Sequence, residues 1–299
     1  MKPKSVALAL LVMALWGSLF PFVKVGYDAF GIASDAVSSI LLFAGLRFVV
    51  SGAVIMLIAK CRKMEFGNLK KVWVPVLISG VFSVTVHYSF QYLGLSIGEG
   101  SKSAIVKQIG SVIAVFASAI FFKSDKLTWR KILGAVIGFA GIVCINYNSG
   151  FLPSKADGFI VLGTLFSVAA TFISKNTYSV AGPIVATGVS QFAGGLLLCL
   201  VGLMQGGSIR PTGIRSVGVM AYICTASVVS YCVWYSLVGK ETLSRLYITK
   251  FAEPVFAAVL SAVMLGENPF RWEYLLAFVC ISGGIMLCRQ PDKAKKNEN

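Results

Sequence analysis

The fold of this chain follows from two stretches of sequence, residues 103–122, SAIVKQIGSVIAVFASAIFF, and residues 246–265, LYITKFAEPVFAAVLSAVML. Each run is mainly apolar and has the length of roughly 20 residues that an α-helix needs to cross the hydrocarbon core of a bilayer. Lys107 is the single charge in the first run, and Lys250 and Glu253 are the charges in the second. Both runs therefore predict transmembrane helices that carry charge at membrane depth.

The composition of the whole chain agrees with a membrane protein. Of the 299 residues, 57% are apolar and 13% are charged, whereas a soluble domain carries roughly 25% charged residues. The same hydrophobicity excludes a disordered chain. The formal net charge of +15 does not indicate nucleic-acid binding, because the basic residues lie in short clusters between long uncharged runs, as they do in membrane loops.

Ten runs of this kind follow one another along the chain. They span residues 5–23, 36–59, 72–98, 103–122, 132–154, 158–174, 176–209, 216–239, 246–266 and 274–288. Gly182-Pro183 lies near the start of the seventh run, so we expect that helix to begin after this turn. The prediction is an all-α integral membrane protein with ten transmembrane helices and no room for a soluble domain.

The loop charges predict the orientation of these helices. With the N-terminus inside, 18 Lys and Arg residues lie in inner segments and 5 in outer ones, and such an excess marks the cytoplasmic side. We therefore expect a multi-pass protein of the cell membrane (plasma or inner) with both termini in the cytoplasm. The basic tail, residues 289–299, is interpreted as a topology signal.

The two halves of the chain resemble each other. A shift of 143 residues places Tyr88 on Tyr231 and Lys107 on Lys250, and residues 101–145 share 12 of 45 positions with residues 244–288. The chain therefore divides into a first five-helix repeat, residues 4–147, and a second, residues 157–288. Because five is odd, the second repeat enters the membrane from the opposite side, and inverted repeats of this kind place a transport site near the bilayer midplane.

Several short motifs resemble those of the EamA family of the drug/metabolite transporter superfamily, and the resemblance covers nearly the whole chain. They are Trp16-Gly17-Ser18 with Phe20 and Lys24, Arg47, Glu253-Pro254-Val255, Leu265-Gly266-Glu267 and Gly283-Gly284. In the first half the pattern departs from the family, with Ser111 at the expected proline and Ser124 at the expected acid. The resemblance implies a central cavity lined mainly by helices 1, 3, 4, 6, 8 and 9, with helices 5 and 10 outside, and relatives that export or import small metabolites.

Ionisable residues inside the predicted spans are the first candidates for function, because they are costly to insert. Lys107 and Lys250, which the repeat matches, are expected to contact substrate in the cavity. Arg47 lies in the middle of its span and either binds ligand or bonds helix-end carbonyls. Lys24 and Lys175 lie near helix ends and either act as gates or extend to the interface.

Topology and repeat together suggest two lysine-bearing gates. Lys24 and Lys107 would lie toward the outer side, and Lys175 and Lys250 toward the inner side. Glu253 follows Lys250 by three residues, a spacing at which helical side chains interact, so Glu253 is the candidate for proton coupling. The alternative is a static Lys250–Glu253 ion pair that only orders its helix.

Aromatic residues form a second group of candidates. They either line the cavity or pack at helical spacing, and they are Trp16, Tyr88, Tyr92, Tyr231, Trp234 and Tyr235. His87, the single histidine, is interpreted as a packed, hydrogen-bonded side chain rather than a proton relay.

The residues favour a secondary transporter over an enzyme. Neither metal-ligand spacing nor a phosphate-binding glycine pattern is present, so no cofactor or metal is expected. The cations in the spans favour a small polar metabolite with a carboxylate, such as an amino acid or an organic acid. We expect it to be moved by alternating access, with the proton as the candidate coupling ion. An intramembrane enzyme acting on a lipid-linked substrate and a channel remain the alternatives. The expected partners are this substrate and the lipid bilayer, and the expected assembly is a monomer or homodimer.

Overall fold

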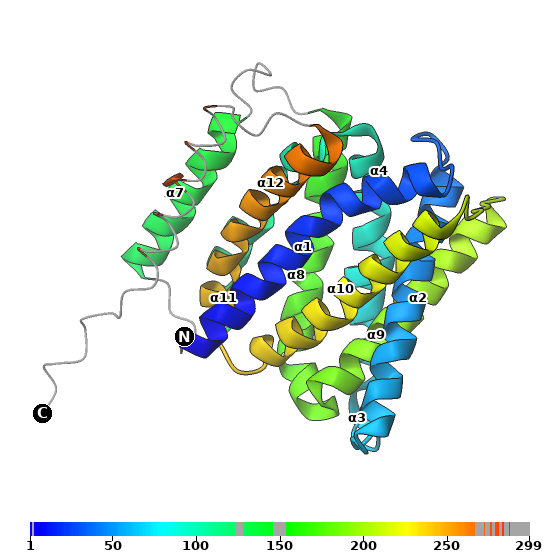
Figure 1. Cartoon of the computed structure of the whole chain (residues 1–299). Helices are drawn as coiled ribbons and strands as arrows, with labels where there is room; N and C mark the ends of the chain where they lie inside the picture. Colours follow the sequence, from blue (N-terminus) through cyan, green and yellow to red (C-terminus); the bar gives the residue numbers. More distant parts are fainter. Residues whose placement is uncertain are drawn as a thin grey trace, which may run out of the picture.

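The computed structural model describes residues 1, 3–122, 128–145 and 154–266, together with residues 272, 276, 279, 280, 283 and 287. Within these residues the regular structure is entirely helical (Figure 1). The first half holds α1 (Pro3–Ala29), α2 (Val37–Cys61), α3 (Leu69–Gly80), the π-helical segment η1 (Val81–Val86), α4 (His87–Ile97), α5 (Gly100–Val106), α6 (Ile109–Phe121) and α7 (Trp129–Ile145). The second half holds α8 (Lys155–Ala181), α9 (Pro183–Met204), α10 (Ile214–Val238), α11 (Leu243–Thr249), the 3-10 segment η3 (Lys250–Ala252) and α12 (Glu253–Leu265).

Eight helices in the described part of the chain are long and apolar enough to cross a membrane, and they correspond to eight of the ten expected spans. Three of them are composite: Leu69–Ile97 from α3, η1 and α4, Lys102–Phe121 from α5 and α6, and Leu243–Leu265 from α11, η3 and α12. The expected turn at Gly182 separates α8 from α9. The expected span 132–154 coincides in part with α7, and the span 274–288 lies largely outside the described residues.

Among the described elements α2 and α9 make the most extensive helix–helix contact, and small residues permit it. A Cβ atom on Gly45 would lie 2.5 Å from the backbone nitrogen of Cys199, and one on Gly195 would lie 2.7 Å from the backbone nitrogen of Val49. Such close approach of two backbones is the usual packing mode where lipid supplies no hydrophobic drive between helices.

The remaining spans pack across the two halves of the sequence. Helix α1 lies against α10 and α12, and helix α8 lies against α3, α4 and α6. Figure 1 shows α1 and α10 side by side across the front of the bundle, with α7 at its edge. Each half therefore supplies one long helix, α1 or α8, that packs against helices of the other half.

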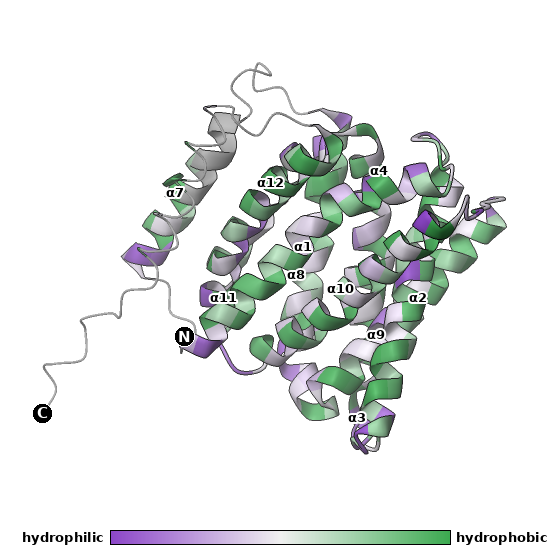
Figure 2. Cartoon of the chain, viewed as in Figure 1, coloured by the Kyte–Doolittle hydropathy of each residue, from purple (hydrophilic) through white to green (hydrophobic). Residues whose placement is uncertain are grey.

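The outer surface is suited to lipid. Hydrophobic residues dominate the outward-facing helices, and hydrophilic residues gather at helix ends and connections (Figure 2). On α9, for example, Leu196, Leu200, Leu203 and Met204 are all exposed. The chain is a multi-pass membrane protein, and polar side chains within its spans such as Ser79, Gln91 and Gln191 are buried inside the bundle.

Candidate functional site

Two transmembrane helices are interrupted at the lysines that the repeat matches. Helix α5 ends at Val106, directly before Lys107, and α6 begins at Ile109. In the second half α11 ends at Thr249, and Lys250 begins the 3-10 segment that leads into α12. Backbone groups freed at membrane depth need other partners. Each break therefore brings polar backbone groups next to a charged side chain, Lys107 or Lys250.

The two breaks are stabilised differently. In the second half Pro254 has no N–H to donate and sits in the first turn of α12, where a missing donor costs little. In the first half Gln108 donates from Nε2 to the Ala104 carbonyl oxygen at 3.2 Å, and Ser111 donates to Gln108 Oε1 at 3.0 Å. At the first break the side chains of Gln108 and Ser111 therefore satisfy part of the local hydrogen bonding. At the second break Pro254 has no N–H group that needs a partner.

Glu253 forms an ion pair across the two halves. Lys107 Nζ donates to Glu253 Oε1 at 2.8 Å, and the Glu253 side chain is fully buried. The Lys250–Glu253 pair expected from their spacing is therefore wrong, because the carboxylate is turned toward a lysine 146 residues away. The second oxygen, Oε2, is buried and has no hydrogen-bond partner.

Lys250 is surrounded by aromatic rings. Its Nζ lies 4.5 Å from the ring centroid of Tyr247, 4.8 Å from that of Trp234 and 5.1 Å from that of Trp16. Ring faces attract a cation but do not neutralise it. Within the described residues no carboxylate lies within 4 Å of this ammonium group, so Lys250 can accept an anionic ligand.

Lys107 and Lys250 belong to one cluster. Both ammonium groups lie over the Trp16 ring, that of Lys107 at 5.6 Å from the centroid and that of Lys250 at 5.1 Å. The expected division into an outer lysine gate and an inner one is wrong for this pair. The helix breaks bring the two side chains to the same place because α5–α6 and α11–α12 both approach α1.

The other two lysines lie elsewhere. Lys175 donates to the carbonyl oxygens of Val238 at 3.2 Å and Glu241 at 2.9 Å, at the C-terminal end of α10. Lys24 on α1 is half-buried. Neither residue lines any of the three pockets described below, which contain Lys107 or Lys250.

Arg47 is buried between the halves. It donates from Nε to Ser227 Oγ at 2.7 Å and from Nη1 to the Tyr92 hydroxyl at 2.6 Å, and its guanidinium carbon lies 5.3 Å from the Tyr88 ring centroid. The third nitrogen, Nη2, is buried without a partner. These bonds go to side-chain oxygens, not to helix-end carbonyls as one of the two expectations had it.

Aromatic side chains predicted from the sequence meet in the centre of the bundle. The hydroxyls of Tyr88 and Tyr231 hydrogen-bond to each other, and Tyr231 lies 5.5 Å from Trp16 and 6.2 Å from Tyr235 between ring centroids. Tyr92 lies 5.7 Å from Tyr88 by the same measure. All five residues line pockets.

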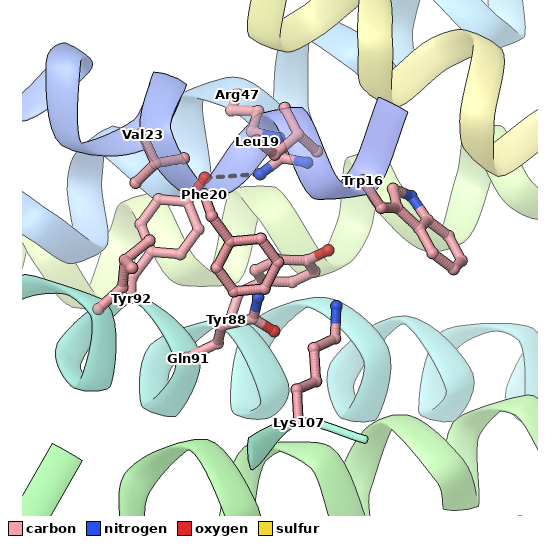
Figure 3. Close-up of a pocket in the computed structure, with 10 residues that line it drawn as sticks. Trp16, Leu19, Phe20, Val23, Arg47, Tyr88, Gln91, Tyr92 and Lys107 are labelled. Atoms are coloured by element: carbon pink, nitrogen blue, oxygen red, sulfur yellow. Dashed lines mark hydrogen bonds between the residues drawn. The ribbon is translucent and has the colours of Figure 1, made fainter. Parts of the chain in front are cut away.

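Three small pockets surround these residues and share Lys107. Figure 3 shows the first of them, with Arg47 above Tyr88 and Gln91 and with the Lys107 side chain pointing toward the space between these residues. The second pocket holds Lys250 and Glu253, and the third joins Lys250 to Trp16 and Tyr88. Each has room for about one water molecule, so the bundle is closed around the site.

Some site residues have no counterpart in the sequence predictions. They include Tyr247, Gln91, Thr164, Ser167 and Thr171, which line the pockets. The last three recur at a spacing of three and four residues on α8, the pattern of one helix face, and this spacing is a signal that could have identified them. His87 is packed as expected, because its Nδ1–H donates to the Gly163 carbonyl oxygen at 2.8 Å.

Comparison with known proteins identifies relatives over the whole length. The model of the EamA-like transporter family matches residues 3–147 and 154–289. The uncharacterized transporter YvbV of Bacillus subtilis is 26% identical over 99% of this chain and 94% of its own, and a probable terminal-alkyne amino-acid exporter of Streptantibioticus cattleyicolor is 21% identical over 89% of this chain and 87% of its own. A protein crystal structure superimposes with a TM-score of 0.77 at 20% identity over 97% of this chain and 98% of that one, which shows a shared fold.

Proposed function

Because the chain belongs to the EamA-like transporter family, and is thus a membrane transporter and not an enzyme, we propose that it moves a small metabolite with a carboxylate group by alternating access. Amino acids and organic acids are the favoured substrates. The observation that carries this proposal is Lys250, a buried ammonium group that faces three aromatic rings and no carboxylate of the described residues. A substrate carboxylate supplies the charge that this group needs in a low-dielectric site.

The proposed architecture is ten helices in two inverted repeats. Three observations support it. The membrane helices break at Lys107 and at Lys250, which are matched positions, the matched residues Tyr88 and Tyr231 touch each other, and the long helices α1 and α8 pack in corresponding ways. In such a protein each half can adopt the conformation of the other, which exposes one central site to each side of the membrane in turn.

Glu253 is the proposed proton-coupling residue. In its charged form it is paired with Lys107, and protonation removes this ion pair. Lys107, freed from its partner, then becomes a second cation for the substrate carboxylate beside Lys250. Proton binding and substrate binding are thereby linked through Lys107, and not through Lys250, the neighbour that the spacing along the helix suggested.

The proposed location is the cell membrane, with both termini in the cytoplasm. The loop charge bias of 18 to 5 carries this part. Lys24 and Lys175, which lie away from the central cluster, are assigned to helix ends and not to substrate.

A ligand screen on the purified full-length protein tests the proposed substrate class. Metabolites are added singly and the midpoint of thermal unfolding is measured, since a ligand that binds the folded state raises it by mass action. Carboxylate-bearing metabolites are expected to stabilise the protein, and matched amides or amines are not. Stabilisation by permanently cationic compounds alone contradicts the proposal.

A further inference from the structure

The pockets hold more positive charge than one carboxylate neutralises. Among the described residues that line them, Arg47, Lys107 and Lys250 are cations, and Glu253 is the single anion. Lys107 is matched to Glu253 by their ion pair. Two cations, Arg47 and Lys250, are left without a carboxylate partner in the described part of the chain, and unpaired buried charge is costly.

The environment of Arg47 favours an acidic group. Its Nη2 is buried with no hydrogen-bond partner, and so is the indole Nε1 of Trp16, which lines the same pocket. Both are donors, and a buried donor without an acceptor costs about 1–3 kcal/mol. A guanidinium keeps its charge and offers a planar array of donors that matches a carboxylate.

Arg47 and Lys250 line different pockets among the three that the described residues form. Arg47 lines the first, and Lys250 lines the second and third. The first and third are joined through Trp16, Tyr88 and Lys107, which line both. Because the two cations line different, connected pockets, two acidic groups joined by a short carbon chain fit this arrangement better than one compact dianion such as a phosphate group.

We infer that the substrate carries two acidic groups, one bound by Lys250 and the second by Arg47 with Trp16. This inference rests on the proposed function and narrows it to dicarboxylates, with or without an amino group. It also assigns Arg47 a binding role beyond its bonds to Tyr92 and Ser227. Those bonds hold the guanidinium through Nε and Nη1 and leave Nη2 as a donor for the ligand.

Matched pairs of ligands test the second acidic group. The full-length protein is titrated with glutamate and glutamine, aspartate and asparagine, and succinate and butyrate, and dissociation constants are obtained from ligand-induced stabilisation or calorimetry. The wild type is expected to bind the member with two acidic groups about tenfold more tightly or better, the effect of one charged hydrogen bond. Equal affinity within every pair overturns the inference.

Variants of Arg47 assign the effect to its guanidinium. Arg47→Gln is expected to bring the affinity ratio within each pair close to one and to leave the affinity for glutamine and butyrate unchanged. Arg47→Lys keeps the charge and should retain part of the preference. Arg215→Met, which removes an exposed cation that lines none of the three pockets, is the control and should retain the full ratio. If Arg47→Gln fails to fold, as judged by size-exclusion chromatography, the ratio in Arg47→Lys decides, and an unchanged ratio overturns the inference.

The outcomes separate this inference from the proposed function. If ligands with one acidic group bind as tightly as those with two, and Lys250→Met abolishes their binding, the function stands and the second acidic group is wrong. If no carboxylate binds, both are wrong. Strong binding of inorganic phosphate or a phosphate monoester, lost in Arg47→Gln, replaces the dicarboxylate by one compact dianion and also overturns the inference.

Discussion

The hydroxyl groups of Tyr88 on α4 and Tyr231 on α10 hydrogen-bond to each other in the centre of the bundle. These two residues are 143 positions apart, which is the shift that aligns the two halves of the sequence. Equivalent residues of two repeats touch only where they lie near the axis that relates the repeats. In the proposed inverted-repeat architecture the pair would mark this axis, and Lys107 and Lys250 are gathered around Trp16, whose ring lies 5.5 Å from that of Tyr231.

Removing either of these two hydroxyls alone should destabilise the protein by more than half of the loss that removing both causes. Tyr88→Phe or Tyr231→Phe leaves a buried hydroxyl without its partner, at about 1–3 kcal/mol, and the double variant should lose less than the sum of the two. Thermal or denaturant unfolding in detergent measures the cycle. Tyr222→Phe, whose hydroxyl bonds Ser18, is the control and should add independently to Tyr231→Phe. Strict additivity of Tyr88→Phe and Tyr231→Phe would contradict a direct bond.

Breaking the Lys107–Glu253 ion pair from one side should destabilise the protein strongly. Lys107→Met leaves a fully buried carboxylate without a partner, and such a change costs about 3–5 kcal/mol. Adding Glu253→Gln removes the stranded charge and should restore most of the lost stability. Arg215→Met breaks the exposed pair with Asp28 and should change the free energy of unfolding by less than about 1 kcal/mol. A Lys107→Met protein as stable as the wild type would show that the pair is not formed.

Glu253→Gln should uncouple transport from pH. Glutamine has the shape of a protonated glutamate and its Oε1 still accepts from Lys107, so folding and substrate exchange should persist while uptake driven by a pH gradient is lost. Substrate accumulation in proteoliposomes with and without an imposed gradient measures this. Arg215→Met serves as the control with normal coupling. Unchanged pH dependence in Glu253→Gln would exclude Glu253 as the coupling residue.

Both ends of the chain should face the cytoplasm. The excess of Lys and Arg in the inner segments predicts this orientation, and reporter fusions at the C-terminus and within residues 146–157 measure it. A reporter that is active only in the cytoplasm should be active at the C-terminus and inactive in the loop. A C-terminus outside the cell would contradict the ten-span topology.

The spans could be predicted from the sequence because hydrophobic length alone determines them. The helices observed within residues 3–121 and 155–265 follow the predicted apolar runs, and the matched lysines are visible in the sequence as charges inside two of those runs. The turn at Gly182 was also predicted, since glycine followed by proline ends one helix and begins the next. Its φ of 85° is one that glycine adopts readily.

The partners of the charged residues could not be predicted in the same way. Spacing along a helix identifies neighbours on that helix, and it suggested Glu253 beside Lys250. The actual partner of Glu253 is Lys107, from the other half of the chain. Similarly, no local pattern connects Arg47 with Ser227, because the contact depends on how α2 and α10 pack.

Substrate exchange by Lys250→Met tests whether Lys250 binds the substrate carboxylate. Proteoliposomes are loaded with an unlabelled carboxylate identified by the ligand screen, and the entry of the labelled form is measured for the wild type, Lys250→Met and Lys24→Met. Methionine keeps the length of the side chain and removes the charge, and Lys24 lies away from the cluster, so Lys24→Met is the matched control. We predict that exchange is lost in Lys250→Met and retained in Lys24→Met, with both variants folded. Exchange at the wild-type rate in Lys250→Met would contradict a carboxylate site at this lysine.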